Sequence, residues 1–203
     1  MCNMYLEKEI KFDEFILKNW NIDFTKDLYK LAKNPNVSLS CGWLPHENIK
    51  DTNSIIQNIL INNLFDENNK NYAVFLKNNN NSINKLTLIG SVGLKDKNQS
   101  EYFNEDNQFE IGYWLGEEFW GKGYMTKILT NMIDYLFDNS GLNINTIWCG
   151  YFKDNIKSKR VQEKCGFEFA YLVEDKEIKL IDKVKDVYIT SITKERYLNE
   201  LNY

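Results

Sequence analysis

A short glycine-containing stretch, Trp120-Gly121-Lys122-Gly123-Tyr124-Met125-Thr126, has residue types suited to binding an anion. It lies between a predicted strand and the most strongly periodic helix of the chain. Glycines let the backbone approach a ligand closely, and the first turn of a helix offers N–H groups without an intrahelical partner. The helix dipole and the charge of Lys122 add to this. The stretch favours a pyrophosphate site, although a plain tight turn into a helix accounts for the same residues.

A nucleotide-binding P-loop is a competing interpretation of this segment. Gly116, Gly121 and Lys122 satisfy most of that pattern, but position 123 is glycine where the motif requires a Ser or Thr hydroxyl for magnesium. The bulky Phe119 and Trp120 also stand where such a loop closes around phosphates. These residues argue against a phosphotransferase.

A family resemblance enters at residues 109–126, Phe109-Glu-Ile-Gly-Tyr-Trp-Leu-Gly-Glu-Glu-Phe-Trp-Gly-Lys-Gly-Tyr-Met-Thr126. This segment resembles the acetyl-CoA-binding signature of the GNAT superfamily of N-acetyltransferases, and most of all its Rim-type branch of ribosomal-protein N-terminal acetyltransferases. Asn155-Ile-Lys-Ser158 and Val161-Gln-Glu-Lys-Cys-Gly-Phe167 are similar to that branch's Asn-x-x-Ser and Glu-Lys-x-Gly-Phe motifs. Two motifs at the right separation make the resemblance specific.

The resemblance implies an α/β (α+β) fold, with one domain over residues 1–203 and a central mixed, splayed sheet that carries helices on both faces. Acetyl-CoA, the acetyl donor, would lie between the fourth and fifth strands, with its pyrophosphate on backbone N–H groups of about Lys122 to Thr126. A bulge near residues 111–113 would present backbone to the pantetheine and polarise the thioester carbonyl. The implied cofactor-binding residues are Ile111, Gly112, Tyr113, Trp120, Gly121, Lys122, Gly123, Tyr124, Met125, Thr126 and Asn155.

The chain departs from the family pattern at two positions. Met125 is larger than the small residue usual at the end of the glycine motif, and would tighten the pocket. Gln162 occupies the place where many relatives carry a tyrosine that acts as general acid. A tyrosine acid therefore cannot be carried over to this chain.

The chemistry requires a neutral amine. An α-amino group needs only about 1 kcal/mol to lose its proton at neutral pH, whereas a lysine needs roughly 4–5 kcal/mol. One carboxylate could serve an α-amine, directly or through water. Glu110 is the candidate base, because strand alternation can direct it to the cleft and relatives often place a glutamate there; a surface charge is the alternative. Glu117 and Glu118 are weaker candidates, since paired acids before a helix usually complement its dipole.

Ser158 matches a branch serine proposed to protonate the departing CoA thiolate, with helix capping as the equally weighted alternative. Asn155 is expected to cap that helix and to touch the cofactor. Cys149 and Cys165 fit buried apolar positions without a basic neighbour, which argues against covalent catalysis. His46 is expected in a loop that lines the acceptor mouth. Because it is the chain's one histidine and no CxxC spacing occurs, we expect no metal site.

The surrounding pattern predicts alternating helices and strands. Predicted strands cover residues 14–20, 72–76, 86–94, 108–115, 146–152, 167–173 and 184–192. Predicted helices cover residues 27–32, 125–137, 155–164 and 194–201, together with one that starts at Asp51 or Thr52 and carries Ile55, Ile56, Ile59, Leu60 and Leu64 on one face. The order indicates one mixed sheet.

The composition limits the class of protein. With 203 residues and 43% hydrophobic residues, the chain can bury a core. A net charge of −4 argues against nucleic acid as the main partner. The sequence shows no signal-peptide pattern and no apolar run of membrane-spanning length, and its four cysteines are scattered, so we expect a cytoplasmic protein that does not bind membranes.

We therefore expect an N-acetyltransferase that moves acetyl directly from acetyl-CoA to a primary amine. A non-catalytic acyl-CoA sensor on the same fold is the alternative. The acceptor remains open among a protein N-terminus, a polyamine, an amino sugar antibiotic and another small amine. The oligomeric state remains open between monomer and dimer.

Overall fold

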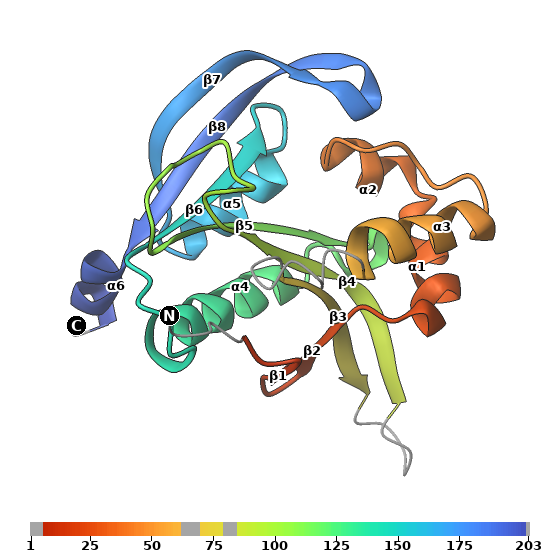
Figure 1. Cartoon of the computed structure of the whole chain (residues 1–203), viewed down its shortest axis with the longest axis horizontal. Coiled ribbons are helices and arrows are strands. Elements are labelled where there is room, and N and C mark those ends of the chain that lie inside the picture. Colours follow the sequence, from red (N-terminus) through yellow and green to blue (C-terminus); the bar gives the residue numbers. More distant parts are fainter. Residues whose placement is uncertain (1–5, 62–69, 79–84, 202–203) are drawn as a thin grey trace. The chain divides into compact units, whose positions relative to one another are not determined.

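The computed structural model describes residues 6–61, 70–78 and 85–201 (Figure 1). They belong to two compact units. The first comprises Met1–Gly93 and Tyr113–Tyr124, and the second comprises Leu94–Gly112 and Met125–Tyr203. Strands β4 (Lys85–Lys95) and β5 (Gln108–Leu115) contribute residues to both units.

The sheet of the first unit begins with three antiparallel strands, β1 (Glu9–Lys11), β2 (Phe15–Asn19) and β3 (Lys70–Asn78). Leu17 in the middle of β2 is fully buried and stands opposite Val74 of β3. Strand β4 lies beside β3, as expected for the predicted hairpin. The asparagine-rich turn predicted between them lies outside the described residues.

Three helices pack in the first unit: α1 (Thr25–Ala32), α2 (Pro35–Ser40) and α3 (Ile49–Ile55), which continues as a π-helical turn over Ile56–Ile61. Helix α1 and the π-helical turn contribute to a core that also holds Trp20, directly after β2, and residues of β3 and β4: Trp20, Leu28, Leu31, Ala32, Ile56, Ala73, Phe75 and Leu88. The apolar residues of α1, and Ile56 directly after α3, are therefore spaced so that they are buried in this core.

Two sequence predictions for these helices were wrong. The predicted N-cap of α3, Asp51 or Thr52, is instead Asn48, whose side-chain oxygen accepts from the Asp51 N–H at 2.9 Å. Helix α2 was not predicted because Pro35 follows the end of α1. Proline is tolerated in the first turn of a helix, and Asn34 caps α2 by accepting from the Asn36 N–H.

The second unit contains a parallel strand pair. Strand β5 pairs in parallel with β6 (Thr146–Phe152) at three positions, the last of which joins Glu110 to Trp148. Strand β6 pairs along its length with the antiparallel β8 (Lys183–Thr193), which also pairs with β7 (Glu168–Ile178). In Figure 1, β7 and β8 form a long two-stranded ribbon. The short β5–β6 pairing agrees with a splayed sheet.

Helix α4 (Tyr124–Asp134) runs into a π-helical turn over Tyr135–Asn139. Its predicted apolar stripe is buried, and Gly141 follows with a positive φ of 68°, as a glycine after a helix end often does. Helix α5 (Ile156–Lys164) begins after Asn155, and α6 (Lys194–Leu201) is the predicted last helix.

The strand order is β1-β2-β3-β4-β5-β6-β8-β7. Antiparallel neighbours combine with the parallel β5–β6 pair, and α-helices lie in sequence between β2 and β3, between β5 and β6, and between β6 and β7. The predicted α/β class with a mixed sheet is confirmed. The single domain over residues 1–203 stays a prediction.

Candidate active site

The glycine turn before α4 has a backbone that only glycine adopts readily. Gly121 and Gly123 have φ values of 74° and 75°, and a Cβ added at either would meet no atom within 4 Å. Side chains are therefore disfavoured by backbone conformation, while the space beside both glycines is open. An open, glycine-lined backbone that leads directly into a helix suits close approach by an anionic ligand.

Two side chains hold this turn in the first unit. The Trp120 indole N–H donates to the Leu115 carbonyl at 2.8 Å, which ties the turn to the end of β5. The Lys122 ammonium lies over the Phe119 ring, 5.7 Å from its centroid. The bulky residues that argue against a P-loop thus position the turn and its cation.

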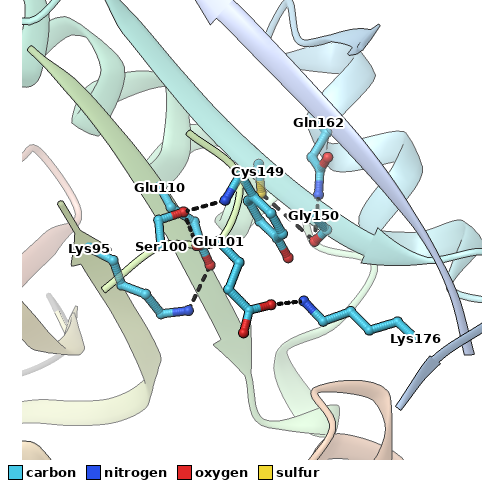
Figure 2. A network of polar contacts seen from close by, with 9 residues as sticks. Lys95, Ser100, Glu101, Glu110, Cys149, Gly150, Gln162 and Lys176 are labelled. Carbon is cyan, nitrogen blue, oxygen red and sulfur yellow. Dashed lines mark hydrogen bonds and ion pairs between the residues drawn. The ribbon is translucent and has the colours of Figure 1, made fainter. Parts of the chain in front are cut away.

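The predicted base, Glu110, lies in the second unit and is only 8% exposed. One carboxylate oxygen accepts from the Lys95 ammonium at 2.7 Å, and the other accepts from the Ser100 hydroxyl at 2.7 Å (Figure 2). Glu110 is therefore neither an exposed surface charge nor without partners. Sequence reasoning missed Lys95 and Ser100, because nothing in their local pattern shows that they meet a residue on the next strand.

The segment between β4 and β5 places Tyr102 beside this network. The Tyr102 N–H donates to the Ser100 hydroxyl oxygen, and the Tyr102 carbonyl accepts from the Tyr171 hydroxyl. Burial raises the pKa of the Tyr102 phenol well above its usual range, and the nearby charge of Glu110 adds to this. The phenol consequently keeps its proton at physiological pH.

The segment is also joined to β7 by an ion pair. Lys176 binds Glu101 at 2.7 Å and lies over the Tyr102 ring, 5.3 Å from its centroid (Figure 2). Because of the Lys176 hydrogen bond, the pKa of Glu101 is lowered. These two contacts of Lys176, together with the Tyr171 hydrogen bond, join β7 to the segment that contacts Glu110.

Ser158 and Asn155 come together at the start of α5. The Asn155 side-chain oxygen accepts from the Ser158 N–H at 3.1 Å, so Asn155 is the N-cap that the sequence predicted. The Ser158 hydroxyl accepts from the Gln162 side-chain amide at 3.2 Å.

The candidate pantetheine-contacting residues follow the last β5–β6 pair. Ile111 is buried, whereas Gly112 is exposed and has open space at its Cβ position. Tyr113 is half-buried at the neighbouring position in the first unit. Met125, which stands where the family usually has a small residue, is buried in the apolar core. The predicted bulge stays a prediction.

The cysteines of the second unit are poorly suited to nucleophilic catalysis. Cys149 and Cys165 are 1% and 9% exposed, and burial raises the pKa of both thiols. Since the thiolate is the nucleophile, burial and a raised pKa make both sulfurs poor nucleophiles. Burial likewise raises the pKa of Cys41, in the first unit, to about 11.

Other polar candidates have structural partners in the first unit. Glu117 accepts from the side-chain amides of Asn34 and Asn36 at 2.6 and 2.9 Å, so it supports the start of α2. The loop residue His46 is buried, and its Nδ1 lies 3.0 Å from the Thr52 hydroxyl. Burial lowers the pKa of His46. These contacts give both residues packing roles.

Neither a metal-binding cluster nor a membrane-spanning helix occurs among the described residues. In the described ranges, no cluster of three or more His, Cys, Asp or Glu side chains could hold a metal ion. Within the same ranges, none of the helices combines the length and apolarity needed to cross a bilayer.

Comparison with known proteins identifies the family. Residues 14–168 match the family described as acetyltransferase (GNAT) domain. The chain is 26% identical over 186 residues to the uncharacterized N-acetyltransferase p20 of Bacillus licheniformis, covering 91% of this chain and 96% of that protein.

Solved structures share the fold. The microcin C7 self-immunity acetyltransferase MccE, in complex with acetyl-CoA and AMP, is 26% identical with a TM-score of 0.70, over 94% of this chain and 98% of that one. RimL, a ribosomal L7/L12 alpha-N-protein acetyltransferase in complex with coenzyme A, is 20% identical with a TM-score of 0.69, over 91% and 97%. The predicted resemblance is confirmed: the chain belongs to the GNAT family of acetyltransferases.

Proposed function

We propose that the chain transfers an acetyl group directly from acetyl-CoA to a primary amine, with the turn at Gly121 and Gly123 as the pyrophosphate site. The observation that carries this placement is the pair of positive-φ glycines with open space beside them, directly before α4. Backbone N–H groups of about Lys122 to Thr126 bind the phosphate oxygens, and the helix dipole favours their charge.

Glu110 is the proposed base for the attacking amine. An ionised carboxylate has about four acceptor positions, so the bonds from Lys95 and Ser100 leave acceptor capacity on both oxygens. Two donors also fix the carboxylate in one orientation. Glu110 therefore receives the amine proton, directly or through one water.

The acetyl group passes from the thioester to the amine without a covalent enzyme intermediate. The amine nitrogen forms a bond to the thioester carbonyl carbon, and the C–S bond breaks. Backbone N–H groups near Ile111 polarise the carbonyl oxygen. The leaving thiolate takes a proton from Ser158, which regains one from water, or takes a proton from water directly. Asn155 both caps α5 and contacts the donor. The buried thiols support this direct route, since neither offers a thiolate.

The proposed acceptor is a protein N-terminus or a small amine. RimL acts on the α-amine of a ribosomal protein, as its name states. A single carboxylate base suits an α-amine, whose deprotonation at neutral pH needs about 1 kcal/mol, better than an unactivated lysine. We expect the chain to act in the cytoplasm as a monomer or dimer, with residues 1–203 as one domain.

A panel of amines tests the proposal. Thiol release from acetyl-CoA is measured with short peptides that carry a free α-amine, with the same peptides blocked at that amine, and with a polyamine and an amino sugar. If thiol release requires one class of free amine, that class contains the acceptor. Tight acetyl-CoA binding without release for any member would instead support the sensor alternative.

A further inference from the structure

We infer that Gln162 is a positioning residue that orients the Ser158 hydroxyl as a proton donor; this inference rests on the proposed function. Gln162 projects from α5 and is 1% exposed. A buried amide is destabilising unless its polar atoms are hydrogen-bonded. Three groups bond to it, from α5, β6 and β8.

The orientation of the amide is fixed by the Gly150 carbonyl. Gln162 Nε2 lies 3.4 Å from that oxygen (Figure 2), which can only accept. On the other side, the Thr190 hydroxyl faces two acceptors, Gln162 Oε1 at 2.7 Å and the Cys149 carbonyl oxygen at 3.2 Å, and the shorter contact is its donation to Gln162. Because a hydroxyl can also accept, the Gly150 carbonyl is the contact that decides which end of the amide carries the N–H groups.

The same nitrogen faces Ser158. Gln162 Nε2 lies 3.2 Å from Ser158 Oγ, and its second N–H donates to that oxygen. Because Ser158 Oγ accepts from Gln162, its own proton is directed to a different group. Gln162 thereby sets the direction in which the Ser158 hydroxyl donates. The backbone N–H of Ser158 donates to the Asn155 side chain.

The place of this cluster suits proton donation to a leaving group. Gly150 stands two residues beyond Trp148, the last residue of β6 that pairs with β5. Its carbonyl accepts from the Gln162 side-chain amide. A glutamine cannot itself supply a proton at neutral pH. In this chain Ser158, and not the residue at position 162, is therefore the proton donor, and Gln162 orients the Ser158 hydroxyl.

A double-mutant cycle tests the inference. Kcat and KM are measured for Ser158→Ala, Gln162→Met and the double variant, with folding checked by thermal unfolding. We expect each single change to lower kcat about 10-fold. The double variant should be no slower than Ser158→Ala alone, and KM for acetyl-CoA should stay unchanged, because Gln162 acts through the serine hydroxyl.

Other outcomes separate the two claims. If Ser158→Ala leaves kcat intact, the proposed role of Ser158 fails. If Ser158→Ala is slow but Gln162→Met slows it further by the full factor, Gln162 acts independently of the serine and the inference is overturned. Should Gln162→Met not fold, Gln162→Glu keeps the shape but offers Ser158 an acceptor; the same non-additivity is expected, and additivity contradicts it.

Discussion

The hydroxyl of Tyr102 occupies the space where a side chain at Gly150 would begin. A Cβ built at position 150 lies 2.7 Å from the Tyr102 hydroxyl oxygen, and 3.2 and 3.3 Å from two ring carbons. Gly150 is therefore required by packing and not by backbone conformation. The contact joins strand β6 to the segment that contacts Glu110.

Gly150→Ala should consequently overpack this contact. We expect it to reduce the free energy of unfolding by about 1–3 kcal/mol. Tyr102→Phe in the alanine background removes the closest atom and should restore part of the loss, with Tyr102→Phe alone as the control. Denaturant unfolding of all three variants measures this. A double variant as unstable as Gly150→Ala would show that the hydroxyl does not fill the space.

Replacement of Gly123 by valine should abolish acetyl-CoA binding. A valine at this positive φ is strained by about 1–3 kcal/mol, and its side chain fills the open space proposed for the ligand. Gly141→Val is the matched control, because Gly141 has a similar φ of 68° and open surroundings but follows α4 instead of preceding it. Calorimetric titration with acetyl-CoA should detect binding only in the control. Equal affinity in both folded variants would remove the pyrophosphate site from this turn.

Glu110→Gln should lower turnover by about 10²-fold or more and remove the acidic limb of the pH–rate profile, while acetyl-CoA affinity hardly changes. The change also breaks the ion pair with Lys95, so Lys95→Met is the control. That variant loses the same pair but retains the carboxylate, and should keep the acidic limb. If both variants lose it equally, the ion pair and not the base explains the effect.

Local patterns predicted most elements because their causes are local. Strands β5 and β6 and helix α6 have the predicted bounds. The misplaced α3 cap and the missed α2 also have local causes, since Asn48 and Asn34 each cap a helix from just outside its apolar pattern.

The candidate site was less predictable because its contacts join distant residues. The Asn155 cap could be predicted, because it depends on a hydrogen bond to a residue only three positions along the chain. Glu110 depends on Lys95 and Ser100, and Gln162 depends on Thr190 of β8, 28 residues away. Periodicity carries no information on such pairs, so sequence reasoning named Glu110, Ser158 and Gln162 but not the long-range contacts that orient them.

Acidification should destabilise the first unit through His46. Burial lowers the pKa of this histidine in the folded state, while in the unfolded chain it is about 6.5. Below pH 6.5 the unfolded chain therefore binds a proton that the folded chain does not, and the free energy of unfolding falls until the pH reaches the folded pKa. His46→Gln should remove this part of the pH dependence. As the chain has one histidine, its imidazole NMR titration gives the folded pKa directly, and a value above 6.5 would contradict the prediction.

The transfer should proceed in a ternary complex without an acetylated enzyme. Cys149 and Cys165 are buried with raised pKa values, so neither supplies a thiolate that could take the acetyl group first. Initial-rate plots against both substrates should intersect, and radiolabelled acetyl-CoA alone should leave no label on the protein. Ser158→Ala should be slower by about 10-fold, less than Glu110→Gln, because a CoA thiolate leaves readily and its protonation is a small part of the barrier. Parallel initial-rate plots together with label on Cys149 or Cys165 would establish a covalent route. Replacement of the labelled cysteine by alanine would then have to remove both the label and the parallel kinetic pattern.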